Sequence, residues 1–117
     1  MSSEQRRSPR KRPPSPMQVT DALTGAMVGR IGDLSLDGLL LIAQSPIQSD
    51  ALYQLVFHLP DPSGRSQAIE VGVHEAWSES TSTQGHPWVG FRIIDIAPEA
   101  RQRLAQWLAG AEAGARR

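Results

Sequence analysis

The alternation of side-chain character over residues 51–59 is the feature that most constrains the fold of this chain. Every second residue is apolar, and the residues between them include a glutamine and a histidine; the apolar row is Tyr53, Leu55, Phe57 and Leu59. A period of two is typical of a β-strand with one buried face. The sequence PDPSG at 60–64 predicts a turn, and residues 69–77 resume the alternation. These segments therefore predict two neighbouring antiparallel strands.

Short apolar segments nearer the N-terminus predict further strands. Residues 17–19 and 26–31 have strand-like spacing, and a Thr-Gly turn at 24–25 separates them. Gly29 and Gly32 lie within the second segment, where glycine indicates a bulge or a close approach by another group. We therefore expect a hairpin with one irregular strand.

Two more segments complete the expected sheet. The run 39–42 is apolar throughout and too short for a helix, which predicts a strand buried on both faces. Residues 78–87 are expected to form an exposed loop. The chain then returns as a strand over 88–94, with apolar residues at every second position.

The C-terminal segment has a helical period instead. Pro98 suits a first helical position and Glu99 suits the first turn. The apolar residues that follow have helical spacing, and they are Ala100, Leu104, Trp107, Leu108 and Ala111. Five or six short antiparallel strands followed by one amphipathic helix predict a mainly β fold, a small barrel with a terminal helix.

The length and composition limit the domain organisation. A chain of 117 residues has room for one modest core. We expect a domain at 17–112, a flexible basic arm rich in proline at 1–16, and a disordered tail at 113–117. The absence of cysteine excludes disulfides and thiolate chemistry. No stretch approaches the roughly 20 apolar residues of a membrane span, and no signal-peptide core is present, so we expect a cytoplasmic protein.

The formal net charge of zero conceals an asymmetry along the chain. Residues 1–12 carry five basic residues against one acid, whereas residues 13–115 carry five arginines against eleven acids. A cationic arm on an acidic body could fold back onto that body, meet an anionic ligand or reach a nucleic acid. Nucleic acid is disfavoured, because the body provides no basic groove and no interleaved aromatic platform.

The sequence contains no motif that indicates catalysis. His58, His74 and His86 are dispersed over two expected strands and a loop, without the spacing of a metal site. There is no phosphate-binding glycine loop, and no serine-histidine-aspartate arrangement is legible. We expect a binding protein without a metal or a catalytic residue.

Two short polar motifs carry the clearest chemistry. Arg6 and Arg10 are four residues apart on the arm, and Asp33, Ser35 and Gly38 form a polar turn before an apolar run. A guanidinium donates to the O6/N7 edge of guanine, pairs with phosphate and stacks on a base. A carboxylate accepts from the donors on another edge of guanine. Together they predict a site for a planar anionic ligand, although each motif alone also fits a solvated tail or a capped structural turn.

The two motifs resemble the signature of the PilZ domain, R-x-x-x-R followed by D/N-x-S-x-x-G. This domain is the bacterial receptor module for cyclic di-GMP (c-di-GMP). The resemblance extends through the strand that ends at Trp77, the Gly90-Phe91 pair and the closing helix. It implies a six-stranded antiparallel β-barrel with a C-terminal helix, which binds cyclic di-GMP on the barrel surface and needs no cofactor.

The resemblance also implies roles for individual residues. The implied ligand-binding set is Arg6, Arg7, Arg10, Asp33, Ser35, Gly38 and Trp77. The arginines would grip guanine edges and phosphates, with Arg7 as an auxiliary. Asp33 and Ser35 would contact the ligand from the barrel side, and Gly38 would keep the turn open. Trp77 would contact a base unless it is a core residue.

A receptor or adaptor in second-messenger signalling is the function that these features favour. Ligand binding would order the arm and change a face of the barrel that an unidentified downstream protein detects. The alternative is a PilZ-like interaction module that acts without nucleotide.

Overall fold

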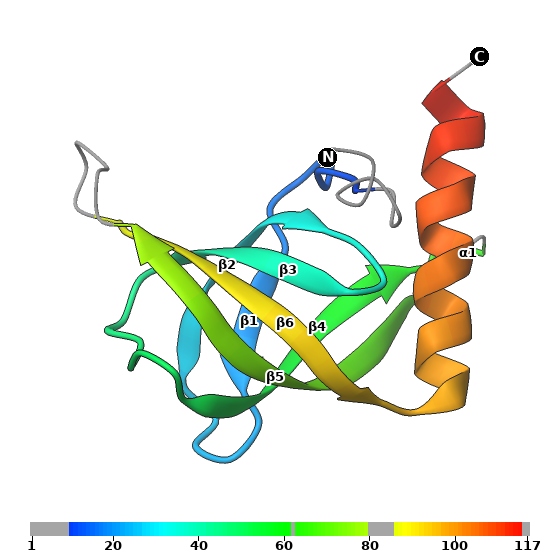
Figure 1. The fold of residues 1–117 in the computed structure, drawn as a ribbon. Coiled ribbons are helices and arrows are strands. Elements are labelled where there is room, and N and C mark those ends of the chain that lie inside the picture. The colour runs from blue at the N-terminus through cyan, green and yellow to red at the C-terminus, as the bar shows by residue number, and fades with distance from the viewer. Residues whose placement is uncertain (1–9, 62, 80–85, 116–117) are drawn as a thin grey trace, which may run out of the picture.

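The computed structural model describes residues 10–61, 63–79 and 86–115, with side chains up to residue 110. Within these residues the chain forms β1 (Gln18–Asp21), β2 (Met27–Leu34), β3 (Gly38–Ala43), β4 (Leu52–Pro60), β5 (Ser66–Glu79), β6 (Trp88–Ile96) and α1 (Pro98–Ala115). The strands close into one antiparallel barrel in the order β1-β2-β3-β6-β5-β4, and α1 stands beside it (Figure 1). The predicted six-stranded barrel with a C-terminal helix is confirmed.

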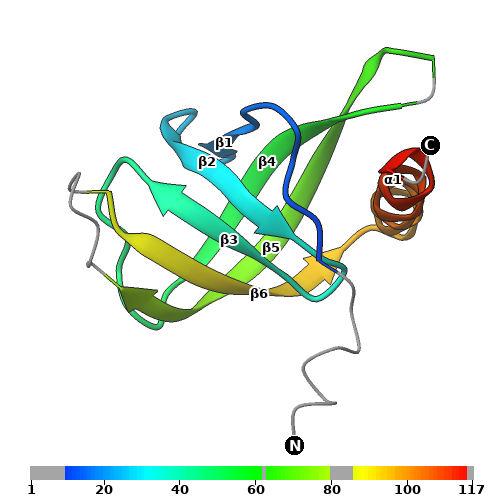
Figure 2. The ribbon, with the colours of Figure 1, turned by 90° about the horizontal axis from the view of Figure 1, so that it is seen from above.

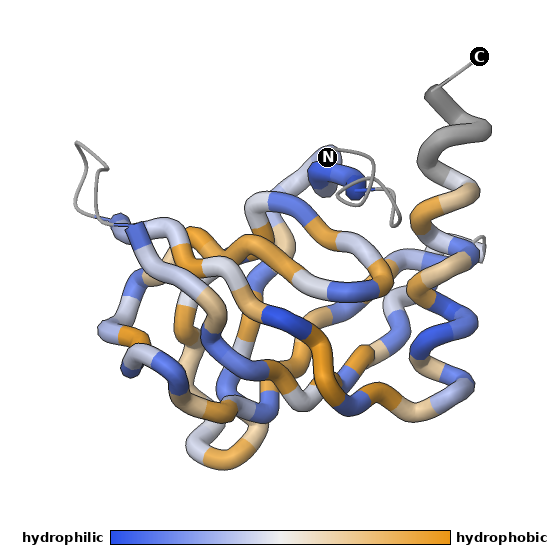
Figure 3. The backbone as a smooth tube through the Cα atoms, in the orientation of Figure 1, coloured by the Kyte–Doolittle hydropathy of each residue, from blue (hydrophilic) through white to orange (hydrophobic). Residues whose placement is uncertain are grey.

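The interior of the barrel is filled by the alternate residues that the sequence pattern indicates. In the apolar row of β4, Leu55 and Phe57 are 0% exposed and Leu59 is 2% exposed, while Tyr53 is partly buried. Hydrophobic and hydrophilic residues alternate along the strands in Figure 3. The inward row of β5 continues from Ile69 through Val73 and ends on an acid, Glu75, which is also buried. The core therefore lies inside the closed sheet, and one carboxylate is enclosed at its end.

Strand β3 differs from its prediction. Leu39, Leu41 and Ala43 are buried, but Leu40 and Ile42 on the other face are only partly buried. The expectation of burial on both faces was wrong, because the helix does not cover the outer face of β3. An apolar outer row on this strand is instead left at the surface of the barrel.

Strand β2 contains the irregularity that its glycines indicate. A Cβ atom at Gly29 would lie 2.3 Å from the carbonyl oxygen of Ile42, so only glycine fits this close approach. The pairing of β2 with β3 shifts between Ile31 and Asp33, which makes Gly32 the site of a bulge. Both expectations for this segment, a close approach and a bulge, are confirmed.

The pairing of β5 with β6 extends further along β5 than predicted. Ser78 and Glu79, expected to begin a loop, are still paired with Val89 and Trp88 of β6. The prediction of a loop from residue 78 was therefore wrong for these two residues. The remainder of that segment, residues 80–85, lies outside the described residues.

Helix α1 rests on the barrel through one narrow face. Ala100, Leu104 and Leu108 are buried, and they lie four residues apart along the helix. Figure 2 shows the helix outside the ring of strands, viewed nearly along its axis. The helix extends to Ala115, so residues 113–115, expected in a disordered tail, are helical. No helix of the described chain is both long and apolar enough to cross a membrane.

The described part of the arm is attached to the end of β2. The N–H of Lys11 donates to the carbonyl of Leu34 at 2.9 Å, and the N–H of Leu34 donates to the carbonyl of Lys11 at 3.0 Å. The pairing of β1 with β2 reaches only to Arg30. Lys11 therefore satisfies backbone groups that β1 leaves unpaired.

Candidate functional site

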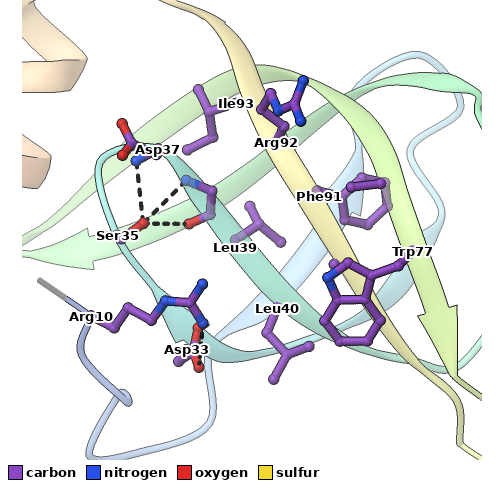
Figure 4. Close-up of a pocket in the computed structure, with 13 residues that line it drawn as sticks. Arg10, Asp33, Ser35, Asp37, Leu39, Leu40, Trp77, Phe91, Arg92 and Ile93 are labelled. Atoms are coloured by element: carbon purple, nitrogen blue, oxygen red, sulfur yellow. Dashed lines mark hydrogen bonds and ion pairs between the residues drawn. The ribbon is translucent and has the colours of Figure 1, made fainter. Parts of the chain in front are cut away.

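A cavity of about 710 Å³ lies at the outer surface of the barrel, between the arm, the β2–β3 turn and the faces of β3, β6 and β5 (Figure 4). This volume is within the range of small-molecule sites. The residues that line it are Arg10, Asp33, Ser35, Asp37, Gly38, Leu39, Leu40, Ala76, Trp77, Gly90, Phe91, Arg92 and Ile93. Its floor is apolar, and its charged groups stand at the edges.

The two polar motifs meet at one edge of this cavity. Nη1 of Arg10 lies 3.6 Å from Oδ2 of Asp33, and the two side chains point toward each other in Figure 4. Lys11 and Leu34, the next residue of each segment, form the backbone pair that holds the arm beside β2. Arginine donors and a carboxylate acceptor are thus presented side by side.

Ser35 acts within the turn. Its Oγ accepts hydrogen bonds from the N–H groups of Asp37 and Gly38, both at 3.2 Å, and donates to the carbonyl of Gly38 at 3.3 Å. Ser35 is 4% exposed. The hydroxyl therefore fixes the backbone of the turn between β2 and β3, which follows Asp33 by two residues.

Gly38 is required by packing. A Cβ atom at this position would lie 2.5 Å from the carbonyl oxygen of Phe91, in the neighbouring strand β6. Among the described glycines, positive φ angles occur at Gly25, Gly29 and Gly64 and not at Gly38. The glycine of the motif thus allows β3 to approach β6 at the floor of the cavity.

Two bulges direct the side chains of the cavity wall. The register of β2 and β3 shifts at Gly32, immediately before Asp33. The register of β5 and β6 shifts between Glu75 and Trp77, immediately before the indole. A bulge re-aims the residue that follows it. The acidic and aromatic walls of the cavity both depend on such a shift.

Trp77 lies flat against the sheet over Gly90. A Cβ atom at Gly90 would be 2.3 Å from Cε2 and Nε1 of the indole, so a larger residue would occupy the place of the ring. Trp77 is 47% exposed. In Figure 4 Leu40 lies between the indole and the Arg10–Asp33 pair. Trp77 is therefore a surface aromatic that faces the cavity rather than a core residue.

Sequence reasoning missed two charged residues of the cavity. Arg92 is exposed on β6, where it pairs across the sheet with Gly38 and with His74. Asp37 stands in the turn, and its carbonyl accepts a hydrogen bond from the N–H of Ile93 at 2.8 Å. The alternation of β6 already placed Arg92 on the outer face with Gly90, which was the available signal.

The histidines do not form a metal centre in the part of the chain that the structure describes. Nε2 of His74 lies 2.6 Å from Oδ1 of Asp50, and the N–H of Asp50 donates to Glu75 at 2.7 Å. Ser78 Oγ donates to the other oxygen of Glu75 at 2.7 Å. The hydrogen bond from Asp50, followed by that from Ser78, lowers the pKa of the Glu75 carboxyl despite its burial. This cluster closes the end of the barrel and lies outside the cavity.

Most of the predicted site residues share this cavity. Those that line it are Arg10, Asp33, Ser35, Gly38 and Trp77. Arg6 and Arg7 lie outside the described residues. The segments that carry the five are far apart in the sequence, and the fold brings them together around one floor.

A comparison with protein families identifies the domain. The family model of the PilZ domain matches residues 4–110. The chain belongs to the PilZ domain family. PilZ domains are binding modules rather than enzymes as a class. No curated protein matches the chain at a significant level.

Solved PilZ proteins have the same fold. The inhibitor of motility MotI/DgrA of Bacillus subtilis is 16% identical, with a TM-score of 0.77 over 95% of this chain and 53% of that one. YcgR of Escherichia coli in complex with c-di-GMP is 19% identical, with a TM-score of 0.72 over 94% and 47%. The chain therefore spans about half the length of these two proteins. The isolated PilZ domain of YcgR with c-di-GMP is 17% identical, with a TM-score of 0.67 over 94% and 93%.

Proposed function

We propose that this PilZ protein is a receptor for cyclic di-GMP that acts as an adaptor in cytoplasmic second-messenger signalling in bacteria. The observation that carries the proposal is the meeting of Arg10 and Asp33 on the wall of the cavity, across from a half-exposed Trp77. Two of the similar structures, both of YcgR, were solved with c-di-GMP. The geometry of the cavity and these similar structures favour a nucleotide receptor over a module that acts without nucleotide.

The two motifs divide the recognition of a guanine between them. Asp33 offers only acceptors, which match the N1 and N2 donors of the base, and Arg10 offers only donors, which match O6 and N7 or a phosphate. The ion pair between them is partly exposed, with 66% of the Arg10 side chain and 27% of the Asp33 side chain accessible, and its two atoms are 3.6 Å apart. An exposed ion pair contributes about 0–1 kcal/mol. A ligand can therefore replace it at little cost.

The rest of the cavity supplies stacking and a second cation. The face of Trp77 lies open over Gly90 and suits a base, since base-aromatic stacking does not depend on sequence. Arg92 stands on β6 and provides a partner for a phosphate. Ser35 and Gly38 act mainly by fixing the turn that presents Asp33. In this proposal Arg6 and Arg7 close over the ligand from the arm.

Ligand binding then acts as a signal. Ordering of the arm changes the charge and shape of one face of the barrel, which a downstream protein detects. The apolar floor and the stacking face of the cavity suit retention of a nucleotide, so we propose a receptor without catalytic activity.

Titration calorimetry of the full chain with cyclic di-GMP tests this function. We expect saturable binding that Asp33→Ala weakens by roughly tenfold or more, because a hydrogen bond to a charged group contributes about 1.5–3 kcal/mol. Asp95→Ala is the matched control, since Asp95 is exposed on β6 outside the cavity. No heat of binding at tens of micromolar protein would exclude the receptor function and favour the nucleotide-independent module.

A further inference from the structure

The arm contacts the helix at the residue that follows Arg10. Nζ of Lys11 lies 3.8 Å from the centroid of the Trp107 ring, which is a cation–π geometry. Burial against the ring lowers the pKa of Lys11. Successive residues of an extended segment point to opposite sides. Arg10 therefore faces the nucleotide cavity while Lys11 faces α1.

The backbone between these two side chains is fixed at one point. Lys11 and Leu34 exchange two hydrogen bonds, and Leu34 follows Asp33, the ion-pair partner of Arg10. No flexible linker separates Arg10 from this fixed point, because the backbone pair of Lys11 with Leu34 follows Arg10 directly. Arg10 and Lys11 therefore keep a fixed register with Asp33 and Leu34.

Helix α1 is held to the barrel by apolar packing. Within the described residues, no hydrogen bond or ion pair joins α1 to a strand, and its apolar contact consists of Ala100, Leu104 and Leu108 with the half-buried Trp107. Trp107 also lines a second cavity of about 450 Å³ between the arm, the β4–β5 hairpin and the helix. Pro13, Pro14 and His58 line the same cavity.

We propose that the contact between Lys11 and Trp107 couples occupancy of the nucleotide cavity to the position of helix α1 and to the shape of the second cavity. Nucleotide bound at Arg10 stabilises the attached arm, and the attached arm holds Trp107. Coupling between two sites is reciprocal. Loss of the helix contact therefore weakens nucleotide binding, and nucleotide binding strengthens the helix contact. This regulation rests on the proposed function.

The three tryptophans of the chain allow a direct test. Trp77 lines the nucleotide cavity, Trp107 lines the second cavity, and Trp88 lines neither. The 117-residue chain labelled with 5-fluorotryptophan gives one fluorine resonance for each tryptophan, and single tryptophan-to-phenylalanine variants assign these resonances. Upon addition of cyclic di-GMP we expect shifts at Trp77 and Trp107, and the smallest shift at Trp88.

The variant Lys11→Met separates coupling from binding, because it retains the length of the side chain and removes the charge. We expect the Trp107 response to disappear, the Trp77 response to persist, and the dissociation constant to rise roughly two- to fivefold, as the loss of an exposed cation–π contact predicts. Arg12→Met removes a charge from the same arm and is expected to leave both responses intact.

The outcomes distinguish the two proposals. No shift at any tryptophan contradicts the receptor function itself. A shift at Trp77 without one at Trp107, or an unchanged Trp107 response in Lys11→Met, overturns the coupling and leaves the receptor function standing.

Discussion

The indole of Trp77 occupies the position that a side chain at residue 90 would take, with ring atoms 2.3 Å from the ideal Cβ position of Gly90. The glycine therefore allows an aromatic face to lie on the sheet. In Gly90→Ala we expect the indole to swing outward, because a half-exposed side chain moves more easily than the barrel. Binding of cyclic di-GMP should weaken roughly fivefold to a hundredfold, since stacking contributes about 1–3 kcal/mol per base.

Calorimetry and thermal unfolding check this prediction together. The melting temperature of Gly90→Ala should stay near that of the wild type. Gly110→Ala is the control, because nothing lies within 4 Å of its added Cβ and alanine favours a helix. Unchanged binding in Gly90→Ala would show that Trp77 does not contact the ligand.

Gly38→Ala is expected to act on stability. Its Cβ would meet the backbone oxygen of Phe91 at 2.5 Å, and backbone cannot move aside without separating β3 from β6. We expect a loss of about 1–3 kcal/mol in the free energy of unfolding, as for overpacking, measured by urea denaturation. Gly25→Ala has open space but a φ of +79°, so strain alone should cost it about 1 kcal/mol. A larger loss at Gly25 would contradict the packing role of Gly38.

Arg92→Met is expected to weaken cyclic di-GMP binding by roughly tenfold, because a charged hydrogen bond to phosphate is lost. The dependence of affinity on salt should also become shallower, since one cation no longer faces the ligand. Calorimetry at two salt concentrations measures both effects. Arg101→Met, on the exposed face of α1, should behave as the wild type. Equal affinities for the two variants would remove Arg92 from the site.

Glu75 predicts a pH dependence of stability. Hydrogen bonds from Asp50 and Ser78 lower its pKa from the usual value of 4.5. A carboxyl whose folded pKa is depressed stabilises the fold above its unfolded pKa, and this stabilisation is lost as the pH falls through the folded pKa. Glu75→Gln should therefore be less stable than the wild type at neutral pH, with a difference that shrinks below about pH 4.5. Thermal unfolding across pH measures it, and Glu79→Gln, at an exposed neighbour, should be as stable as the wild type at neutral pH.

The barrel could be predicted because each strand has a recognisable pattern in its own stretch of sequence. The alternation of β4 identifies Leu55 and Phe57 as interior residues whatever the surrounding topology. The sequence pattern did not predict the burial of β3 correctly. An apolar outer row has the same sequence whether a helix covers it or it lines a cavity. Leu40 is partly buried and lines the cavity, and a pattern of apolar residues cannot distinguish such a position from the core.

The motifs of the candidate site could be predicted from the sequence, but the directions of its side chains could not. Arg10 and Asp33 carry the chemistry in their side chains, so their types and spacing suffice to pair them. The direction of Asp33 and Trp77 depends on register shifts at Gly32 and between Glu75 and Trp77. These shifts arise from pairing between strands and leave little trace in either strand alone. The contact of Lys11 with Trp107 joins the two ends of the chain and has no local signal at all.

The barrel is closed at its narrowest seam by β1 and β4. Only two residue pairs, Thr20 with Val56 and Asp21 with Leu55, join these strands, whereas β4 and β5 are paired along the whole of β4. Local opening follows the fewest backbone hydrogen bonds. Native-state amide exchange should therefore be fastest where β1 meets β4, while the amides of the β4–β5 hairpin stay protected. The barrel is thus expected to open by separation of β1 from β4.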